Sequence, residues 1–272
     1  MNLPYKLKAK LFYFIDKYRL SSILSFFQTY ITRRSNENFD VQSKFWRLHQ
    51  LNLEKFGIVN RKNSMALEIG AGQSLAQNIY LSKIIKIQVV IDITKLLNLK
   101  FTNRAVKYIF GSSSEILKSE IDLQESFGIN YIAPCDVRYF PFKDKTFDAI
   151  YTTNTFEHIP QVDIAPLFNF FYDKLKDDGL LSLVIDYTDH YSHTDSSIDK
   201  FNFRRYSDEE WENYNFSIHF QNRLNNNDYI QLLNMSGFEI IDNFNLESGE
   251  IINENVDDHN FSGGYFLCKK IV

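Results

Sequence analysis

The sequence contains few of the residues that mark disulfide-rich and zinc-binding proteins. Cysteine occurs only twice in 272 residues, as Cys135 and Cys268. The two thiols form no Cys-x-x-Cys or Cys/His spacing, and they stand too far apart in the sequence to be assigned as a bridge. We therefore expect a reducing, cytoplasmic setting.

Long apolar runs and an excess of positive charge are missing as well. No run of about 18 apolar residues could span a bilayer, and residues 1–31 lack the apolar core and cleavage site of a signal peptide. The 34 Asp and Glu residues outnumber the 30 Lys and Arg residues, giving a net charge of −4. Because proteins that bind mainly to nucleic-acid phosphates display a basic surface, we expect no nucleic-acid partner.

The first 34 residues are locally basic and aromatic. Their charged residues are Lys6, Lys8, Lys10, Lys17, Arg19, Arg33 and Arg34 against Asp16 alone, interleaved with Phe12, Phe14, Phe26 and Phe27. One interpretation is a surface helix that touches anionic lipid at the inner membrane face, or that forms a lid over the functional site. The other, which we favour, is a helix packed on the core with solvated lysines.

Short apolar runs alternate with helix-compatible stretches from residue 65 onward. The runs predict strands at 65–70, 88–92, 130–133, 147–151, 180–185, 238–244 and 265–271, and helices are expected at 45–56, 75–85, 164–175 and 228–235. This alternation predicts an α/β fold with a Rossmann-like, mostly parallel sheet of seven strands and helices on both faces.

The segments outside this alternation predict the domain organisation. Residues 1–60 would form an N-terminal helical extension or lid, and residues 61–272 the main domain. A polar and aromatic stretch at about 187–227 predicts a cap insertion after strand five, in which the capping box Ser207-Asp-Glu-Glu210 opens a short helix. A loop of twenty residues between the last two strands is expected to be functional or mobile.

The strongest sequence motif is Glu68-Ile-Gly70-Ala-Gly72-Gln73, at the end of the first strand. Its glycines let the backbone turn tightly and approach a ligand that a Cβ atom would exclude. Leu75 stands where the dinucleotide fingerprint has its third glycine, so that fingerprint fails at its last position. Glu68 would repel a pyrophosphate but suits a cationic ligand.

An aspartate, Asp92, ends the second predicted strand. Asp92 lies twenty residues beyond Gly72, the spacing at which an acidic side chain reaches the hydroxyls of an adenosine ribose. The alternative is an aspartate that only caps a helix, and the register with the glycines favours the ribose.

Two further motifs follow, Asp136-Val137 with Pro141-Phe142 and Phe147-Asp148 with Glu157-His158-Ile159. With E-x-G-x-G and Asp92 they resemble the class I methyltransferases over residues 66–185, which implies S-adenosylmethionine as the cofactor. The implied contacts are Gly70 and Gly72 at the methionine part, Asp92 at the ribose, Asp136 and Val137 at the adenine, Thr153 and Asn154 beside the sulfonium, and Glu68, Gln73 and Ile93 as further cofactor contacts.

Candidates for activating the methyl acceptor follow the fifth strand, between Asp186 and Asp195. Because ligand crevices lie at the carboxyl ends of parallel strands, this segment should face the methyl group. We predict His190 as a general base and Asp189 and His158 as further catalytic residues, since an acceptor oxygen gains from a base that removes its proton. Metal ligation and a structural polar loop are the alternatives; the spacing matches no metal motif, and no metal is predicted.

The cap stretch supports a narrower resemblance, to methyltransferases encoded among bacterial surface-polysaccharide genes. Asp189-His190, the segment from Phe203 to Trp211 and Asn222-Arg-Leu resemble theirs, although Asn225 replaces an arginine. The predicted substrate-binding residues are His193, Arg204, Arg205, Tyr206 and Arg223. Arginine is suited to bidentate binding of phosphate or carboxylate; surface ion pairs with nearby acids are the alternative.

The sequence thus predicts an S-adenosylmethionine-dependent methyltransferase that O-methylates a carbohydrate: a sugar, a nucleotide-linked sugar or a phosphate-bearing substituent of capsule or lipopolysaccharide. Methylation of nucleic acid or protein is disfavoured by the acidic balance. A non-catalytic scaffold that binds the cofactor remains an alternative, because binding is not turnover. An NAD-dependent sugar oxidoreductase is weakened by Leu75 and by the lack of a Tyr-x-x-x-Lys pair.

Overall fold

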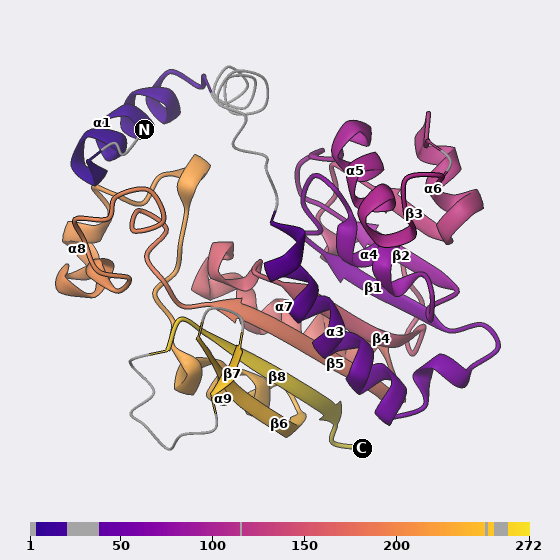
Figure 1. The fold of residues 1–272 in the computed structure, drawn as a ribbon. Helices are drawn as coiled ribbons and strands as arrows, with labels where there is room; N and C mark the ends of the chain where they lie inside the picture. The colour runs from indigo at the N-terminus through magenta and orange to yellow at the C-terminus, as the bar shows by residue number, and fades with distance from the viewer. Residues whose placement is uncertain (1–3, 21–37, 115, 248–249, 253–260) are drawn as a thin grey trace.

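The computed structural model of the chain describes residues 4–20, 38–114, 116–247, 250–252 and 261–272. At its centre lies one sheet with the strand order β3-β2-β1-β4-β5-β8-β6-β7 (Figure 1). The strands are β1 (Met65–Ile69), β2 (Ile87–Ile91), β3 (Ile129–Ile132), β4 (Phe147–Thr153), β5 (Leu175–Asp186), β6 (Phe238–Glu247), β7 (Glu250–Ile252) and β8 (Gly263–Lys270).

The mostly parallel, Rossmann-like sheet is confirmed, but the prediction of seven strands is wrong. Strands β1 to β5 pair in parallel, whereas β8, β6 and β7 form an antiparallel edge. The eighth strand, β7, lies inside the loop expected between the last two strands and places Ile251 opposite Leu246. Three residues are too few to show an alternating pattern, so only pairing with the extended end of β6 reveals this strand.

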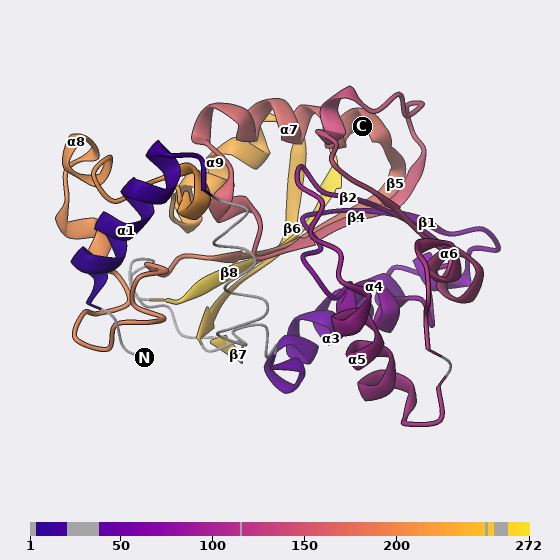
Figure 2. The same ribbon diagram turned by 90° about the horizontal axis from the view of Figure 1, so that it is seen from above.

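Helices cover both faces of the sheet, as predicted. Figure 2 shows α3 (Phe39–Lys55), α4 (Ala76–Leu81) and α5 (Leu99–Phe110) on one side, and α7 (Gln161–Lys174) and α9 (Asn226–Met235) on the other. The remaining core helix, α6 (Glu120–Phe127), contacts β3. Strands β1, β2 and β4 are buried along almost their whole length, which explains why they read as continuous apolar runs and not as alternating ones.

The cap (residues 187–227) contains α8 (Asp208–Trp211), which begins at the predicted Ser207 capping box. Helix α1 (Tyr5–Lys17) packs on this cap and not on the sheet (Figure 1). The Tyr5 amide donates to the Asp195 carboxylate at 2.7 Å. The shared apolar cluster consists of Ala9, Phe12 and Ile15 of α1 and Tyr191, Phe203 and Trp211 of the cap.

The N-terminal extension is therefore divided, since α1 joins the cap whereas α3 joins the sheet. The opposite face of α1 exposes Leu7, Leu11 and Phe14, and its contact with lipid stays a prediction. Phe26, Phe27, Arg33 and Arg34, which belong to the same basic stretch, lie outside the described residues. No helix in the described ranges combines the length and apolar character needed to cross a membrane.

Candidate active site

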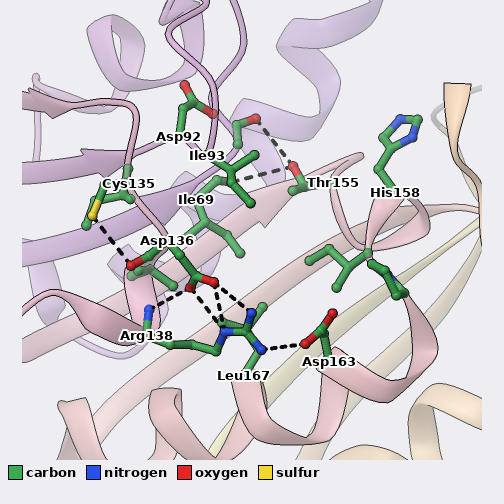
Figure 3. Close-up of a pocket in the computed structure, with 15 residues that line it drawn as sticks. Ile69, Asp92, Ile93, Cys135, Asp136, Arg138, Thr155, His158, Asp163 and Leu167 are labelled. Atoms are coloured by element: carbon green, nitrogen blue, oxygen red, sulfur yellow. Dashed lines mark hydrogen bonds and ion pairs between the residues drawn. The ribbon is translucent and has the colours of Figure 1, made fainter. Parts of the chain in front are cut away.

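A pocket opens where β1, β2 and β4 end, at the carboxyl edge of the parallel strands (Figure 3). Five of the predicted cofactor contacts line it: Gly70, Asp92, Ile93, Asp136 and Val137. Side chains that follow β4 complete the lining, among them Thr155, His158 and Ile159. Position at this edge is what the doubly wound topology requires of a ligand site.

Gly70 lines this pocket in a left-handed backbone conformation that favours glycine. Its φ of +72° is left-handed, and a Cβ atom there would lie 2.4 Å from Thr155 Cγ2. Thr155, two residues beyond β4, was not predicted as a site residue. No sequence pattern marks it, because its contact with Gly70 joins two loops 85 residues apart.

Asp92 presents an unsatisfied carboxylate oxygen to the pocket. The side chain is 4% exposed, and its Oδ2 atom is buried without a hydrogen-bond partner among the described residues. Burial raises the pKa of Asp92 to about 6, although a hydrogen bond with Tyr131 opposes the shift. A buried acceptor of this kind fits a ligand with hydroxyl donors, such as a ribose.

Asp136 lines the pocket but is also held by the protein. Its carboxylate accepts from Arg138 Nη2 at 2.7 Å, and Arg138 Nη1 donates to Asp163 Oδ1 at 2.6 Å (Figure 3). The guanidinium lowers the pKa of Asp136. This ion pair fixes the turn Val137–Tyr139 and leaves Val137 as an apolar wall of the pocket.

Other predicted cofactor contacts lie outside the pocket lining. Glu68 is buried, accepts from Gln77 and Asn78 of α4, and has its pKa raised well above the usual value by burial. Thr153 bonds to Gln77 and to His49 of α3. These side chains form a polar network that holds α3 and α4 against the ends of β1 and β4. His49 was not predicted, since its neighbours in the network are distant in sequence.

Gly72 and Gln73, the other two predicted cofactor contacts of the glycine motif, lie in the loop that leads into α4. Gly72 has a φ of +72°, with nothing within 4 Å of the position of a Cβ atom. Gln73 has a buried Oε1 atom that no described residue bonds. Contact of either residue with a ligand stays a prediction.

A second cavity lies where β4, β5 and β6 end and β8 begins. Its polar lining includes the predicted Asn154 and His193, together with Asp186, Lys200 and Glu247. Asn154 has a left-handed φ of +51°, a strained conformation that is often found at functional sites. Lys200 and Glu247 were not predicted, because β6 and the cap meet only in the folded chain.

A histidine–carboxylate cluster, formed by Glu157, His158, Asp186, His190 and His193, lies between the two cavities. His158 lines the first cavity, whereas Asp186 and His193 line the second. The rings of His158 and His190 lie 4.8 Å apart between centroids, as do those of His190 and His193. His190 Nε2 lies 3.3 Å from Asp186 Oδ2.

The charges of this cluster depend on one another. Burial and the neighbouring Asp186 raise the pKa of Glu157 well above its usual value. Although burial opposes it, hydrogen bonds from His190 and Thr188 keep the pKa of Asp186 low. Burial lowers the pKa of His158 and of His193. Glu157 and Asp186 belong to predicted motifs, but neither was predicted as a site residue.

The structure separates the other predicted residues from this cluster. Asp189 is fully buried inside the cap, where it accepts from the Tyr191 amide at 2.8 Å and from Asn202 Nδ2 at 3.0 Å. Arg223 donates to the carbonyls of Phe203 and Tyr206 and pairs with Asp208. The roles of these residues in catalysis and substrate binding stay predictions.

Two arginines and a tyrosine of the predicted substrate set also lie on the cap. Arg204 stacks over the ring of Phe201 at 3.9 Å, and Arg205 is exposed. Tyr206 bonds to Tyr5 of α1 through their hydroxyl groups. Arg204, Tyr206 and Arg223 line a cavity of their own.

The strand order, the glycine turn and the pocket at the ends of β1, β2 and β4 define the class I methyltransferase fold. In agreement, residues 67–183 match the family described as a methyltransferase domain. Residues 67–183 therefore form a methyltransferase domain, and S-adenosylmethionine is its cofactor. No curated protein matches the sequence significantly.

Solved structures resemble the chain in fold. The 1,6-didemethyltoxoflavin-N1-methyltransferase of Burkholderia thailandensis, solved with 1,6-didemethyltoxoflavin and S-adenosylhomocysteine bound, has a TM-score of 0.56 at 10% identity and covers 99% of this chain and 91% of its own. An S-adenosylmethionine-dependent methyltransferase from Clostridium acetobutylicum has a TM-score of 0.53 at 12% identity, covering 92% and 98%.

The raised pKa of Asp92 predicts that cofactor binding depends on pH. Ribose hydroxyls donate to the charged carboxylate, which is lost as the pH falls through about 6. We expect S-adenosylhomocysteine to bind about tenfold more weakly at pH 5 than at pH 7. Calorimetry between pH 5 and pH 7 measures this change in affinity. Asp92→Asn should bind weakly with little pH dependence; an equally steep profile in this variant would assign the effect to another group, such as Glu68.

Proposed function

We propose that the chain is an O-methyltransferase whose acceptor is a sugar, a nucleotide-linked sugar or a phosphate-bearing substituent of a bacterial capsule or lipopolysaccharide. The observation that carries the proposal is the position of the histidine–carboxylate cluster. It adjoins the cofactor pocket through His158 and the second cavity through Asp186 and His193. An acceptor in the second cavity would have both the methyl donor and ionisable groups beside it.

The lining of the second cavity supports a polar acceptor. Asn154, Thr188 and Lys200 carry donors there, and Asp186 and Glu247 carry acceptors. Lys200 pairs with Glu247 at 2.6 Å, and Thr188 donates to Asp186 Oδ1. A sugar carries many hydroxyl groups that both donate and accept, so a mixed lining of this kind suits it. The net charge of −4 disfavours nucleic acid as the acceptor.

The chemistry asks mainly for positioning and for removal of one proton. S-adenosylmethionine supplies an activated methyl group, so the protein need not create the electrophile. A sugar hydroxyl has a high pKa, and its oxygen becomes a good nucleophile only as the proton leaves. The ionisable side chains of the histidine–carboxylate cluster can favour that loss.

Transfer of a labelled methyl group tests this function. We expect the label to move from S-adenosylmethionine to nucleotide sugars or to fractionated capsule or lipopolysaccharide precursors. Label that appears in RNA or protein instead would overturn the proposed acceptor. A chain that binds S-adenosylhomocysteine in calorimetry but labels none of these fractions would be a cofactor-binding scaffold.

A further inference from the structure

The histidine–carboxylate cluster has the composition and spacing of a metal site. One ligand atom each of Glu157, His158 and His190 lies within 4.8 Å of the others. Asp186, His190 and His193 form a second group with the same limit, and the two groups share His190. We propose that the cluster binds one divalent transition-metal ion, with Glu157, His158 and His190 as its principal ligands.

Glu157 gives the first indication of a cation. Its side chain is 2% exposed, and neither carboxylate oxygen has a hydrogen-bond partner among the described residues. None of the lysines or arginines that the structure describes forms an ion pair with it; its nearest basic partner is His158, with Nε2 4.0 Å from Oε1. Burying a charged carboxylate with neither donors nor a cation is strongly unfavourable, so Glu157 must hold a proton or bind a cation. A metal ion that displaces the proton would give the carboxylate oxygens a partner.

The histidines direct suitable nitrogen atoms toward Glu157. His158 Nδ1 lies 2.8 Å from the Phe220 carbonyl oxygen. Because a carbonyl only accepts, Nδ1 carries the proton and Nε2 keeps its lone pair, the arrangement typical of a metal-bound histidine. His190 Nε2 is buried and lies 3.3 Å from Asp186 Oδ2. Ring nitrogens of His158 and His190 and a carboxylate oxygen of Glu157 thus lie within 4.8 Å of one another.

Asp186 is oriented to add a further oxygen. The amide and the hydroxyl of Thr188 donate to its Oδ1 at 2.8 and 2.6 Å. This leaves Oδ2 facing His190 and His193, at 3.3 and 3.8 Å from their Nε2 atoms. His193 is the weakest candidate ligand, since its Nε2 lies 2.8 Å from the Thr188 hydroxyl and its side chain is 51% exposed.

The ligand set selects the kind of ion. Two imidazoles with a carboxylate suit zinc, manganese, iron or cobalt, whereas magnesium and calcium prefer oxygen ligands alone. Ligands at about 2.1 Å from a tetrahedral ion lie about 3.4 Å apart. The ligand side chains would therefore move slightly closer to one another when the ion binds. His158 faces the cofactor pocket, which leaves the ion accessible from the side where methyl transfer would occur.

The role of the ion rests on the proposed function, although its binding does not. A cation beside the second cavity would lower the pKa of an acceptor hydroxyl placed against it. The acceptor O–H bond and the methyl C–S bond break, the O–CH3 bond forms, and the proton passes to solvent water. His190 would then serve as a ligand, in place of the general base predicted from the sequence.

Titration of the metal-free, untagged full-length chain with Co²⁺, followed by visible absorption, tests the site. We expect saturation at one ion per chain, displacement by Zn²⁺ and a rise in Tm on binding. Glu157→Gln and His190→Ala should each weaken binding at least tenfold. The matched control is Glu239→Gln, which makes the same change at an exposed glutamate of β6. This variant should bind the ion like the wild type.

Two results would overturn the site: no binding of Co²⁺ or Zn²⁺ at millimolar concentration, or equal binding by the wild type and both variants. Calorimetry with S-adenosylhomocysteine shows that each variant is folded. Metal binding without methylation of sugars would refute only the proposed function. Methylation that persists after chelation, with no ion bound, would refute the catalytic role of the ion.

Discussion

His190→Ala is expected to lower the rate of methyl transfer by about 10²- to 10⁴-fold, the range that help with acceptor proton loss contributes. His190 belongs to both groups of the histidine–carboxylate cluster, and its side chain is only 15% exposed. Either role, base or metal ligand, is lost with the imidazole. Single-turnover rates with a saturating acceptor measure the change.

The effect should fall on the chemical step alone. His190 does not line the cofactor pocket, so S-adenosylhomocysteine should bind to the variant as it does to the wild type. His219→Phe is the matched control. Its ring packs 4.9 Å from Phe12 and 4.6 Å from Tyr191, and burial lowers its pKa to about 3, so that it is uncharged. Turnover of His190→Ala within threefold of the control would remove His190 from the reaction.

Gly70→Ala is expected to abolish measurable binding of S-adenosylhomocysteine, whereas Gly72→Ala should bind only slightly more weakly than the wild type. Both glycines have a φ of +72°, so both variants carry the left-handed strain of about 1–2 kcal/mol. The two positions differ in the free space around the added methyl group. A Cβ atom at residue 70 would lie 2.4 Å and 2.6 Å from side-chain atoms of Thr155, whereas none lies within 4 Å at residue 72.

The added methyl group at residue 70 must displace Thr155, which also lines the pocket. Overpacking of this kind costs about 1–3 kcal/mol beyond the backbone strain. Calorimetry and thermal unfolding measure the two effects. Thr155→Ala in the Gly70→Ala chain removes the two nearest atoms and should restore part of the binding. Equal losses in the two single glycine variants would show that backbone strain alone matters.

The cofactor half of the site could be predicted because its residues occupy consecutive parts of one βαβ unit. Glu68 to Gly72 end β1 and Asp92 follows β2, so local sequence places them at the same sheet edge. The side-chain directions were less predictable. Glu68 is turned to α4, where Gln77 and Asn78 satisfy it, because a buried carboxylate takes the nearest available donors.

The positions of the residues predicted for catalysis and substrate binding could not be determined from local sequence. Asp189 and His190 are adjacent, yet Asp189 bonds inside the cap and His190 reaches the cluster. Glu157 and Asp186 meet only because β4 and β5 are neighbours in the sheet. Of the predicted arginines, Arg223 donates to cap carbonyls and Arg204 stacks over Phe201.

The sequence by itself determined the parallel core, the glycine turn and the ribose carboxylate, because these depend on the periodicity and spacing of neighbouring residues. Only the tertiary structure decided the eighth strand, the packing of α1 on the cap, the contact of Thr155 with Gly70 and the gathering of three histidines around Glu157 and Asp186. Each of these joins segments distant in the chain. Such contacts depend on how whole elements pack, which no local pattern encodes.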